Sequence, residues 1–224
     1  MTGRQQITAA LAVYGSRTAI IFYNTYENSV QEYTLRVDEN DECKWEKSKD
    51  KIKIAKQTRI FSPANSRAIL DNLAYRQVIQ FWTKAGYALR YSGALSADIY
   101  HMLVKGEGVY CSIGSKLQKK KLRILYECAP IAFLVEKAGG RSSNGEMSLL
   151  DVKVDGYYQK TDFIVGSKEE VERVQRFVTF EKEKKQKEKQ ASATDGIQKV
   201  TEKKYRIQEK TEPEDEEEDG SDFF

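Results

Sequence analysis

The chain has 224 residues, of which 40% are hydrophobic, which suffices for one globular domain of about 100 to 200 residues followed by a tail. Its 37 basic and 34 acidic residues nearly cancel, so we expect neither a nucleic-acid-binding nor a membrane-binding protein. No apolar run approaches the roughly 18 to 20 residues of a membrane span, and the first six residues (MTGRQQ) lack the apolar core of a secretory signal, so we expect a soluble protein.

The three cysteines, Cys43, Cys111 and Cys128, are widely spaced and form no C-x-x-C pair. They predict neither a disulfide framework nor a zinc site, and they favour a reducing compartment. We expect the cytoplasm, with a plastid as the alternative, because any plastid leader would lie upstream of Met1.

The first part of the chain predicts a helix followed by a hairpin. Residues 5–14 have helical spacing at Ile7, Leu11 and Tyr14, and Gly15 is a credible stop. Two segments rich in β-branched and aromatic residues, 18–23 and 32–37, predict antiparallel strands joined through 24–28. The charged segment 38–53 indicates an exposed connection or a weak edge strand.

Strands and helices then alternate. Residues 66–85 predict a helix in two pieces separated near Asp71, and residues 121–137 predict a helix that Pro130 bends or restarts and Gly139 ends. Between these helices we expect a strand at 87–91, a helix at 94–104 and a strand at 108–113.

The carboxy-terminal part predicts a last strand at 163–165 and a long charged helix from Lys168, with Ser167 as its cap. Beyond about residue 190 the composition is too polar to offset chain entropy, and residues 213–219 (PEDEEED) are almost wholly acidic. We therefore expect an α/β domain at 1–180, with a mixed sheet layered with helices, and a charged helix with a disordered acidic tail at 181–224. An alternative makes this tail the working part, as a segment that recruits a partner.

Few residues could carry chemistry. The single histidine, His101, lies in a predicted helix. The sequence therefore lacks the histidines that a histidine-rich metal site needs, and its one histidine is not placed to serve as the base of a serine–histidine–aspartate hydrolase. The Gly-x-Gly-x-x-Gly and P-loop patterns of nucleotide-binding proteins are absent.

Three features would suit a phosphorylated sugar: Arg90-Tyr91-Ser92-Gly93 before a helix, the basic run at 116–123, and Glu127. A helix amino terminus offers free N–H groups to a phosphate, and an arginine and a lysine add charge-assisted hydrogen bonds. Composition alone also permits a solvated lysine run and an ordinary surface glutamate, so these residues do not decide the function by themselves.

The same segments resemble the family of class 1 fructose-1,6-bisphosphatase and sedoheptulose-1,7-bisphosphatase over residues 3 to about 175. The resemblance rests on residues 3–10 (GRQQITAA), 14–18 (YGSRT), 61–65 (FSPAN), 89–93 (LRYSG), 121–130 (KLRILYECAP) and 133–140 (FLVEKAGG). It corresponds to the carboxy-terminal half of that fold.

The resemblance implies a role for each matching residue. Lys121 and Tyr91 would bind the phosphate that stays on the sugar, Arg90 would reach a neighbouring subunit's site, and Asn65 lies near an asparagine that touches this phosphate. Glu127 would be a ligand of the catalytic Mg2+, a hard cation that prefers oxygen. The resemblance also implies a sugar bisphosphate substrate and a homo-oligomer in the complete enzyme.

Two departures bear on substrate and activity. The fructose enzyme usually has a tyrosine at the position of Cys111 and an Asn-Glu-Gly-Tyr run near Asn65, so their absence favours the sedoheptulose type. The Asp-Pro-Leu-Asp-Gly-Ser signature that holds the metal ions occurs nowhere in the sequence. We therefore expect this polypeptide alone to be inactive, either as a fragment of a complete enzyme or as a truncated, non-catalytic relative that binds sugar phosphates or protein.

Overall fold

The computed structural model describes the backbone of residues 1–208 and the side chains of residues 1–188 and 190. The chain divides into two units, Met1–Glu181 and Lys182–Phe224. The first unit holds two sheets. None of the helices within residues 1–208 is long and apolar enough to cross a membrane.

The first sheet is an antiparallel meander in the order β1-β2-β3-β4. Its strands are β1 (Ala10–Val13), β2 (Ala19–Asn24), β3 (Ser29–Val37) and β4 (Cys43–Lys49). The predicted hairpin is confirmed, with Ala19 opposite Thr34 and Asn24 opposite Ser29. Strand β4 is the predicted weak edge strand, and all seven of its residues are exposed.

The predicted helix over residues 5–14 is wrong. The chain forms only the short 3-10 turn η1 (Gly3–Gln5) and then enters β1, where Leu11 pairs with Ile21. Of the three residues that suggested a helical stripe, Leu11 is buried, whereas Ile7 and Tyr14 are 79% and 84% exposed. A neighbouring strand therefore overrides the local helical spacing.

The second sheet is mixed, in the order β6-β5-β7-β9-β8. Strand β5 (Ile60–Ala64) runs parallel to both β6 (Ala88–Leu89) and β7 (Val109–Ser112). Strand β9 (Phe163–Gly166) runs antiparallel to β7 and to β8 (Arg141–Ser143). The parallel strands need crossover connections, which the helices between them supply.

The helices lie in the predicted regions. The two-piece segment is η2 (Ser66–Leu70) and α1 (Leu73–Lys84), and α2 is Leu95–Lys105. The predicted helix at 121–137 begins later, as the π-helical turn η3 (Ile124–Cys128), and restarts at Pro130 as α3 (Ala129–Lys137). A short 3-10 turn, η4 (Leu149–Asp151), follows β8.

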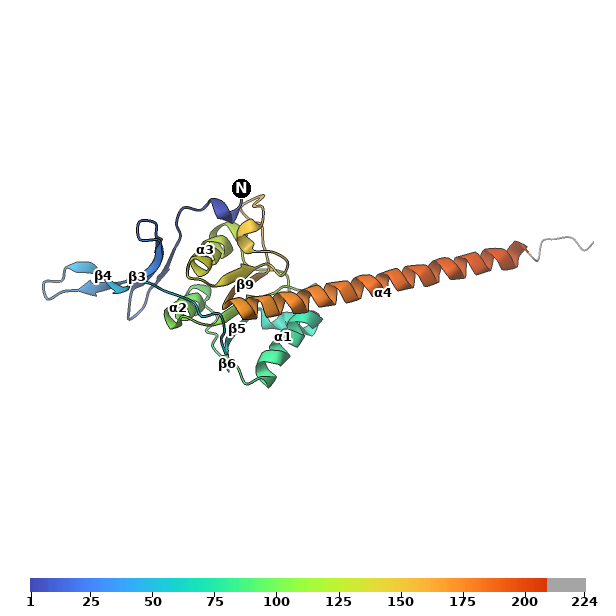
Figure 1. Ribbon diagram of the computed structural model, residues 1–224, viewed down its shortest axis with the longest axis horizontal. Coiled ribbons are helices and arrows are strands. Elements are labelled where there is room, and N and C mark those ends of the chain that lie inside the picture. The colour runs from blue at the N-terminus through green and yellow to red at the C-terminus, as the bar shows by residue number, and fades with distance from the viewer. Residues whose placement is uncertain (209–224) are drawn as a thin grey trace, which may run out of the picture. The chain divides into compact units, whose positions relative to one another are not determined.

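Two buried clusters give the domain its layers. One cluster joins Ile21 and Val30 of the first sheet to Leu103 of α2, Leu134 of α3 and Phe163 of the second sheet. Helices α2 and α3 therefore lie between the two sheets (Figure 1). The other cluster lies on the far face of the second sheet, where α1 and the start of α4 pack: Phe61, Tyr75, Val78, Trp82, Val109, Cys111, Ile164, Val171, Val174.

Helix α4 (Lys168–Gln208) begins directly after Ser167, as predicted. The Ser167 hydroxyl accepts the N–H of Gly108 at 3.4 Å, and its carbonyl accepts the N–H of Val171 at 3.1 Å. The helix continues well past residue 190, where the sequence predicts a loss of order. The acidic run at 213–219 lies outside the described residues.

Candidate functional site

The carboxyl ends of three parallel strands meet at one edge of the second sheet. Ala64, the last residue of β5, pairs with Ser112, the last residue of β7, and Phe61 pairs with Leu89, the last residue of β6. Asn65 and Arg90 follow directly, so this edge collects loops from separate parts of the sequence. Such an edge is the usual ligand-binding position in an open α/β sheet.

Tyr75 of α1 fixes the geometry of this edge. Its hydroxyl oxygen lies 2.6 Å from the carbonyl oxygen of Ala64 and 2.9 Å from that of Cys111. The side chain is fully buried, and burial raises the pKa of the Tyr75 phenol, which keeps it a neutral donor. The ends of β5 and β7 are therefore held together by a side chain beneath them.

Asn65 occupies a left-handed conformation with φ of 53° just after β5. Its side-chain Nδ2 donates to the carbonyl of Ile113 at 2.9 Å, and its Oδ1 is buried without a hydrogen-bond partner in the described residues. The Asn65 amide, the donor that a phosphate would need, is thus directed at the backbone after β7. This hydrogen bond connects the end of β5 to the segment after β7 and so helps to fix the edge.

The loop after β6 carries Arg90 and Tyr91. The Arg90 N–H donates to the Phe61 carbonyl at 3.0 Å, and the Ser62 hydroxyl donates to the Arg90 carbonyl. The Arg90 side chain is exposed, and its guanidinium donates to the Leu89 carbonyl at 2.8 Å. The Tyr91 side chain is 44% exposed, so both groups are accessible to a ligand.

Asp98 of α2 shapes the same loop, and the residue-level reasoning gave it no role. Its Oδ1 accepts the Ser92 N–H at 2.7 Å, while its Oδ2 is buried and has no partner in the described residues. Gly93 has φ of +90°, which disfavours any other residue there. The α2 amino terminus carries no side-chain cap, so its first N–H groups are open, although Asp98 adds a negative charge beside them.

The segment with Lys121 runs along the same edge. The Leu122 carbonyl accepts the Thr161 N–H at 3.1 Å, and the Ile124 N–H donates to the Gln159 carbonyl at 2.8 Å. Residues 159–161 lead into β9, whose first residue, Phe163, pairs with Ser112 at the end of β7. Lys121 is exposed at this edge. The topology therefore brings Asn65, Arg90, Tyr91 and Lys121 to one side of the sheet, although no hydrogen bond or ion pair joins these four within the described residues.

Glu127 lies in η3, directly after this segment. Its Oε2 accepts the Arg123 N–H at 2.7 Å and lies 3.7 Å from the Arg123 guanidinium. The Arg123 Nε is buried without a hydrogen-bond partner in the described residues, and the guanidinium stacks 5.6 Å from the Tyr126 ring. Arg123 ends the basic run at 116–123 that the sequence singled out, and it is a cationic donor between Lys121 and Glu127. Its contacts with Glu127 were not predicted, because they depend on the π-helical turn.

The donor set fits Mg2+ only in part. Both described contacts of Glu127 use Oε2, so Oε1 is the atom that could face a cation, and carboxylate oxygen suits Mg2+. Among the side chains that the structure describes, those of residues 1–188 and 190, no three from His, Cys, Asp or Glu lie close enough together to hold a metal ion. Glu127 could therefore contribute one ligand to a site that needs others.

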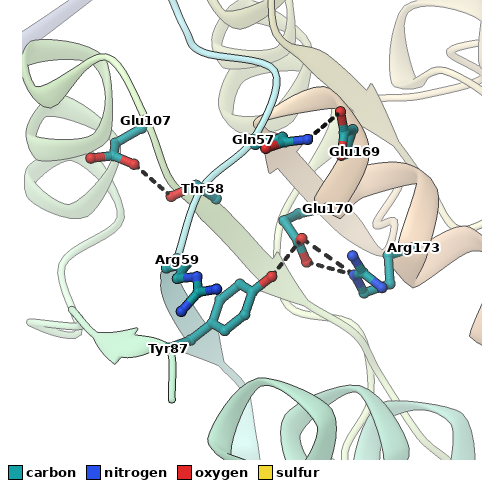
Figure 2. A pocket seen from close by; sticks show the side chains of 8 residues that line it. All are labelled: Gln57, Thr58, Arg59, Tyr87, Glu107, Glu169, Glu170 and Arg173. Carbon is teal, nitrogen blue, oxygen red and sulfur yellow. Dashed lines mark hydrogen bonds and ion pairs between the residues drawn. The ribbon is translucent and has the colours of Figure 1, made fainter. Parts of the chain in front are cut away.

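A cavity of about 410 Å3 lies at the opposite, amino-terminal ends of these strands, beside the start of α4 (Figure 2). Its centre is the Glu170 carboxylate, which is 2% exposed and accepts hydrogen bonds from Trp82 at 2.8 Å and Tyr87 at 2.9 Å. Arg173 adds an ion pair at 3.1 Å. The Glu170 carboxylate is thus paired with donors from α1, from α4 and from the residue before β6. We therefore interpret the cavity as a packing junction between these segments.

Comparison with known proteins decides the family. Residues 54–179 match the family described as Fructose-1-6-bisphosphatase, C-terminal domain. The chain belongs to this family. The matched region contains every candidate site residue of the bisphosphatase domain: Asn65, Arg90, Tyr91, Lys121 and Glu127.

Relatives of both bisphosphatase types are similar to the chain. It is 38% identical over 176 residues to chloroplastic sedoheptulose-1,7-bisphosphatase of Spinacia oleracea, covering 79% of the chain and 44% of that protein. It is 33% identical over 182 residues to class 1 fructose-1,6-bisphosphatase of Cytophaga hutchinsonii, covering 79% of the chain and 51% of that protein. The chain thus spans about half the length of the curated relatives it matches.

Solved structures agree with the predicted fold. A crystal structure of a putative sedoheptulose-1,7-bisphosphatase from Toxoplasma gondii has a TM-score of 0.70 at 38% identity, covering 80% of this chain and 58% of that one. The T-state fructose-1,6-bisphosphatase of Leishmania major has a TM-score of 0.71 at 29% identity, covering 79% and 55%. The α/β fold predicted from the sequence is confirmed, as is the resemblance to the carboxy-terminal half of the bisphosphatase fold.

Proposed function

We propose that this chain is the sugar-phosphate-binding half of a sugar-bisphosphate 1-phosphatase of carbohydrate metabolism. The proposal is supported by the position of the segments that carry Arg90, Tyr91 and Lys121, which follow strand ends along one sheet edge next to the turn that carries Glu127. An exposed arginine, lysine and phenol are donors suited to a phosphate, and an adjoining carboxylate suits a divalent cation.

Each residue has a distinct role in this proposal. Lys121 and Tyr91 donate to the phosphate that remains on the sugar, and Arg90 donates to the same group, either in its own subunit or in a neighbouring one. Asn65 holds the ends of β5 and β7 in place through Ile113 and contributes to phosphate binding by positioning. Glu127 supplies one oxygen to Mg2+, and Arg123 orients that carboxylate.

Bound Mg2+ would polarise the 1-phosphate and lower the pKa of the attacking water in the complete enzyme. The residues of this chain bind and orient the substrate, while the other metal ligands come from elsewhere. We therefore propose that the isolated 224-residue polypeptide hydrolyses bisphosphates negligibly. We also propose a homo-oligomer for the complete enzyme, in the cytoplasm or a plastid.

The proposed substrate is sedoheptulose 1,7-bisphosphate, with fructose 1,6-bisphosphate as the alternative. The fructose type usually has a tyrosine at the position of Cys111, which in this chain is a cysteine buried in the second sheet. The higher identities to the sedoheptulose-type relatives support the same choice.

The test is to join this chain to the metal-binding half of a related sedoheptulose-1,7-bisphosphatase and measure phosphate release from both bisphosphates with and without Mg2+. We expect Mg2+-dependent release, faster from the seven-carbon substrate. Tight binding of sedoheptulose 7-phosphate without any turnover of the joined protein would support the alternative, a non-catalytic sugar-phosphate-binding relative.

A further inference from the structure

Another cavity, lined by lysines, lies away from the sugar-phosphate edge. It has a volume of about 240 Å3 and is formed by the β2–β3 turn at Asn28, the connection after β4, and the carboxyl end of α3. Backbone hydrogen bonds fix its walls, because Ile52 donates to Val30 and Ile54 donates to Ala138, both at 2.8 Å.

All charged side chains that line this cavity are lysines. Lys51, Lys53 and Lys137 line it, and no carboxylate does. The nearby acids are engaged with other cations, since Lys47 lies 3.4 Å from Glu27 and 2.8 Å from Asp50. Within the described part of the chain, no carboxylate pairs with any of the three lining lysines. The three lysines are exposed, so water weakens their mutual repulsion, and an anion between them would replace that repulsion with attraction.

The uncharged groups of the cavity also offer donors. The Ser29 hydroxyl is buried and has no hydrogen-bond partner among the described residues, although an unsatisfied buried hydroxyl normally costs about 1 to 3 kcal/mol. The Asn28 Oδ1 accepts from the Tyr23 hydroxyl at 2.5 Å, which leaves Nδ2 with its two N–H groups for a ligand. The Asn28 amide therefore adds donors to the cationic site, and the Ser29 hydroxyl is a buried, unpaired group in the cavity wall.

Lys137 is held in place before any ligand arrives. Its Nζ lies 4.6 Å from the centre of the Tyr23 ring and 5.4 Å from that of Phe133. Contacts with two aromatic faces restrict the side chain and reduce the entropy lost on binding. The same Tyr23 orients Asn28, so two of the donors share one support.

We propose that the cavity of Ser29, Lys51, Lys53 and Lys137 is a second anion site that binds a small phosphate-bearing ligand. A solvated surface run would account for Lys51 and Lys53, but it would leave the buried Ser29 hydroxyl without a partner. The site is distinct from the edge with Lys121, and it does not depend on the phosphatase activity proposed above.

The experiment uses the full chain in chloride buffer, with inorganic phosphate and inorganic pyrophosphate as probes and backbone amide NMR as the readout. We expect saturable shifts at residues 28–30, 51–54 and 137–139, with tighter binding of pyrophosphate. Lys51→Met combined with Lys53→Met should weaken pyrophosphate binding at this cavity at least tenfold, which corresponds to about 1.4 kcal/mol. Ser29→Ala should weaken it by a smaller factor.

Two controls separate this site from others. Lys121→Met removes a cation from the sugar-phosphate edge and should leave the shifts at 28–30 and 51–54 unchanged. Lys84→Met removes an exposed charge at the end of α1 and should also have no effect. Equal pyrophosphate affinity in the parent and the double variant, shifts confined to the edge with Lys121, or no binding at millimolar concentration would each overturn the proposal.

Discussion

The Glu127 carboxylate accepts the backbone N–H of Arg123 at 2.7 Å, within the turn that opens the α3 segment. This bond satisfies one of the free N–H groups at a helix start and fixes the direction of the carboxylate at the same time. The proposed metal ligand is therefore oriented by the chain that carries it, before a cation binds.

Replacing Glu127 separates the structural and metal-binding roles of this carboxylate. Glu127→Gln keeps a neutral acceptor for the Arg123 N–H, so we expect a loss of unfolding free energy below about 1 kcal/mol, whereas Glu127→Ala should cost about 1 to 2 kcal/mol. Both variants should lose most of the Mg2+-dependent phosphate release of the joined enzyme. Urea denaturation and the phosphate assay measure the two effects. Full activity in Glu127→Gln would remove Glu127 from the metal site.

Glu170 should be a major determinant of stability. Its removal leaves the Trp82 N–H, the Tyr87 hydroxyl and Arg173 without their acceptor, so Glu170→Ala should lower the unfolding free energy by about 3 kcal/mol or more. Glu169→Ala is the matched control, because this neighbouring side chain is only half-buried and accepts a single hydrogen bond, from Gln57 at 3.1 Å, so its loss should cost less than about 1 kcal/mol. Similar losses in the two variants by urea denaturation would contradict our view of the cavity in Figure 2 as a packing junction.

Stability should fall at alkaline pH because two thiols are buried. Burial raises the pKa of Cys128 and, well above its ordinary value, that of Cys111. Below the unfolded-state pKa of about 8.5, both states hold the protons and no stability is lost. Above it, the unfolded chain releases protons that the folded chain keeps, so unfolding free energy should fall by about 1.4 kcal/mol per pH unit for each thiol.

The measurement for this pH effect is urea denaturation between pH 8 and pH 10. Cys128→Ala should reduce the slope of unfolding free energy against pH by about half. Cys43→Ala is the control, because Cys43 is exposed on β4 and its replacement should leave the slope unchanged. A slope that is identical in parent and Cys128→Ala would contradict the assignment.

Local signals predicted much of this fold. The hairpin of β2 and β3, the break between η2 and α1, and the restart at Pro130 each follow from residues within a few positions of one another. The helix prediction for residues 5–14 failed because Leu11 pairs with Ile21 of β2, and no local pattern encodes that pairing. The π-helical turn at η3 was also not predicted, since it depends on the hydrogen bonds that residues 122 and 124 make with 159–161.

The candidate site was predictable only through the family resemblance. Residue types pointed to Arg90, Lys121 and Glu127, but also permitted ordinary surface charges. The supporting contacts of Tyr75, Asp98 and Arg123 join segments far apart or depend on loop geometry, so composition and spacing could not reveal them.

The most direct test of the central claim is calorimetric titration of the full chain with sedoheptulose 7-phosphate. We expect saturable binding that Lys121→Met weakens by about 1.5 to 3 kcal/mol, as the loss of a charge-assisted contact predicts. Lys119→Met, which removes an exposed charge from the same run, should bind like the parent. Equal affinities in all three proteins, or no binding by the parent, would contradict the account.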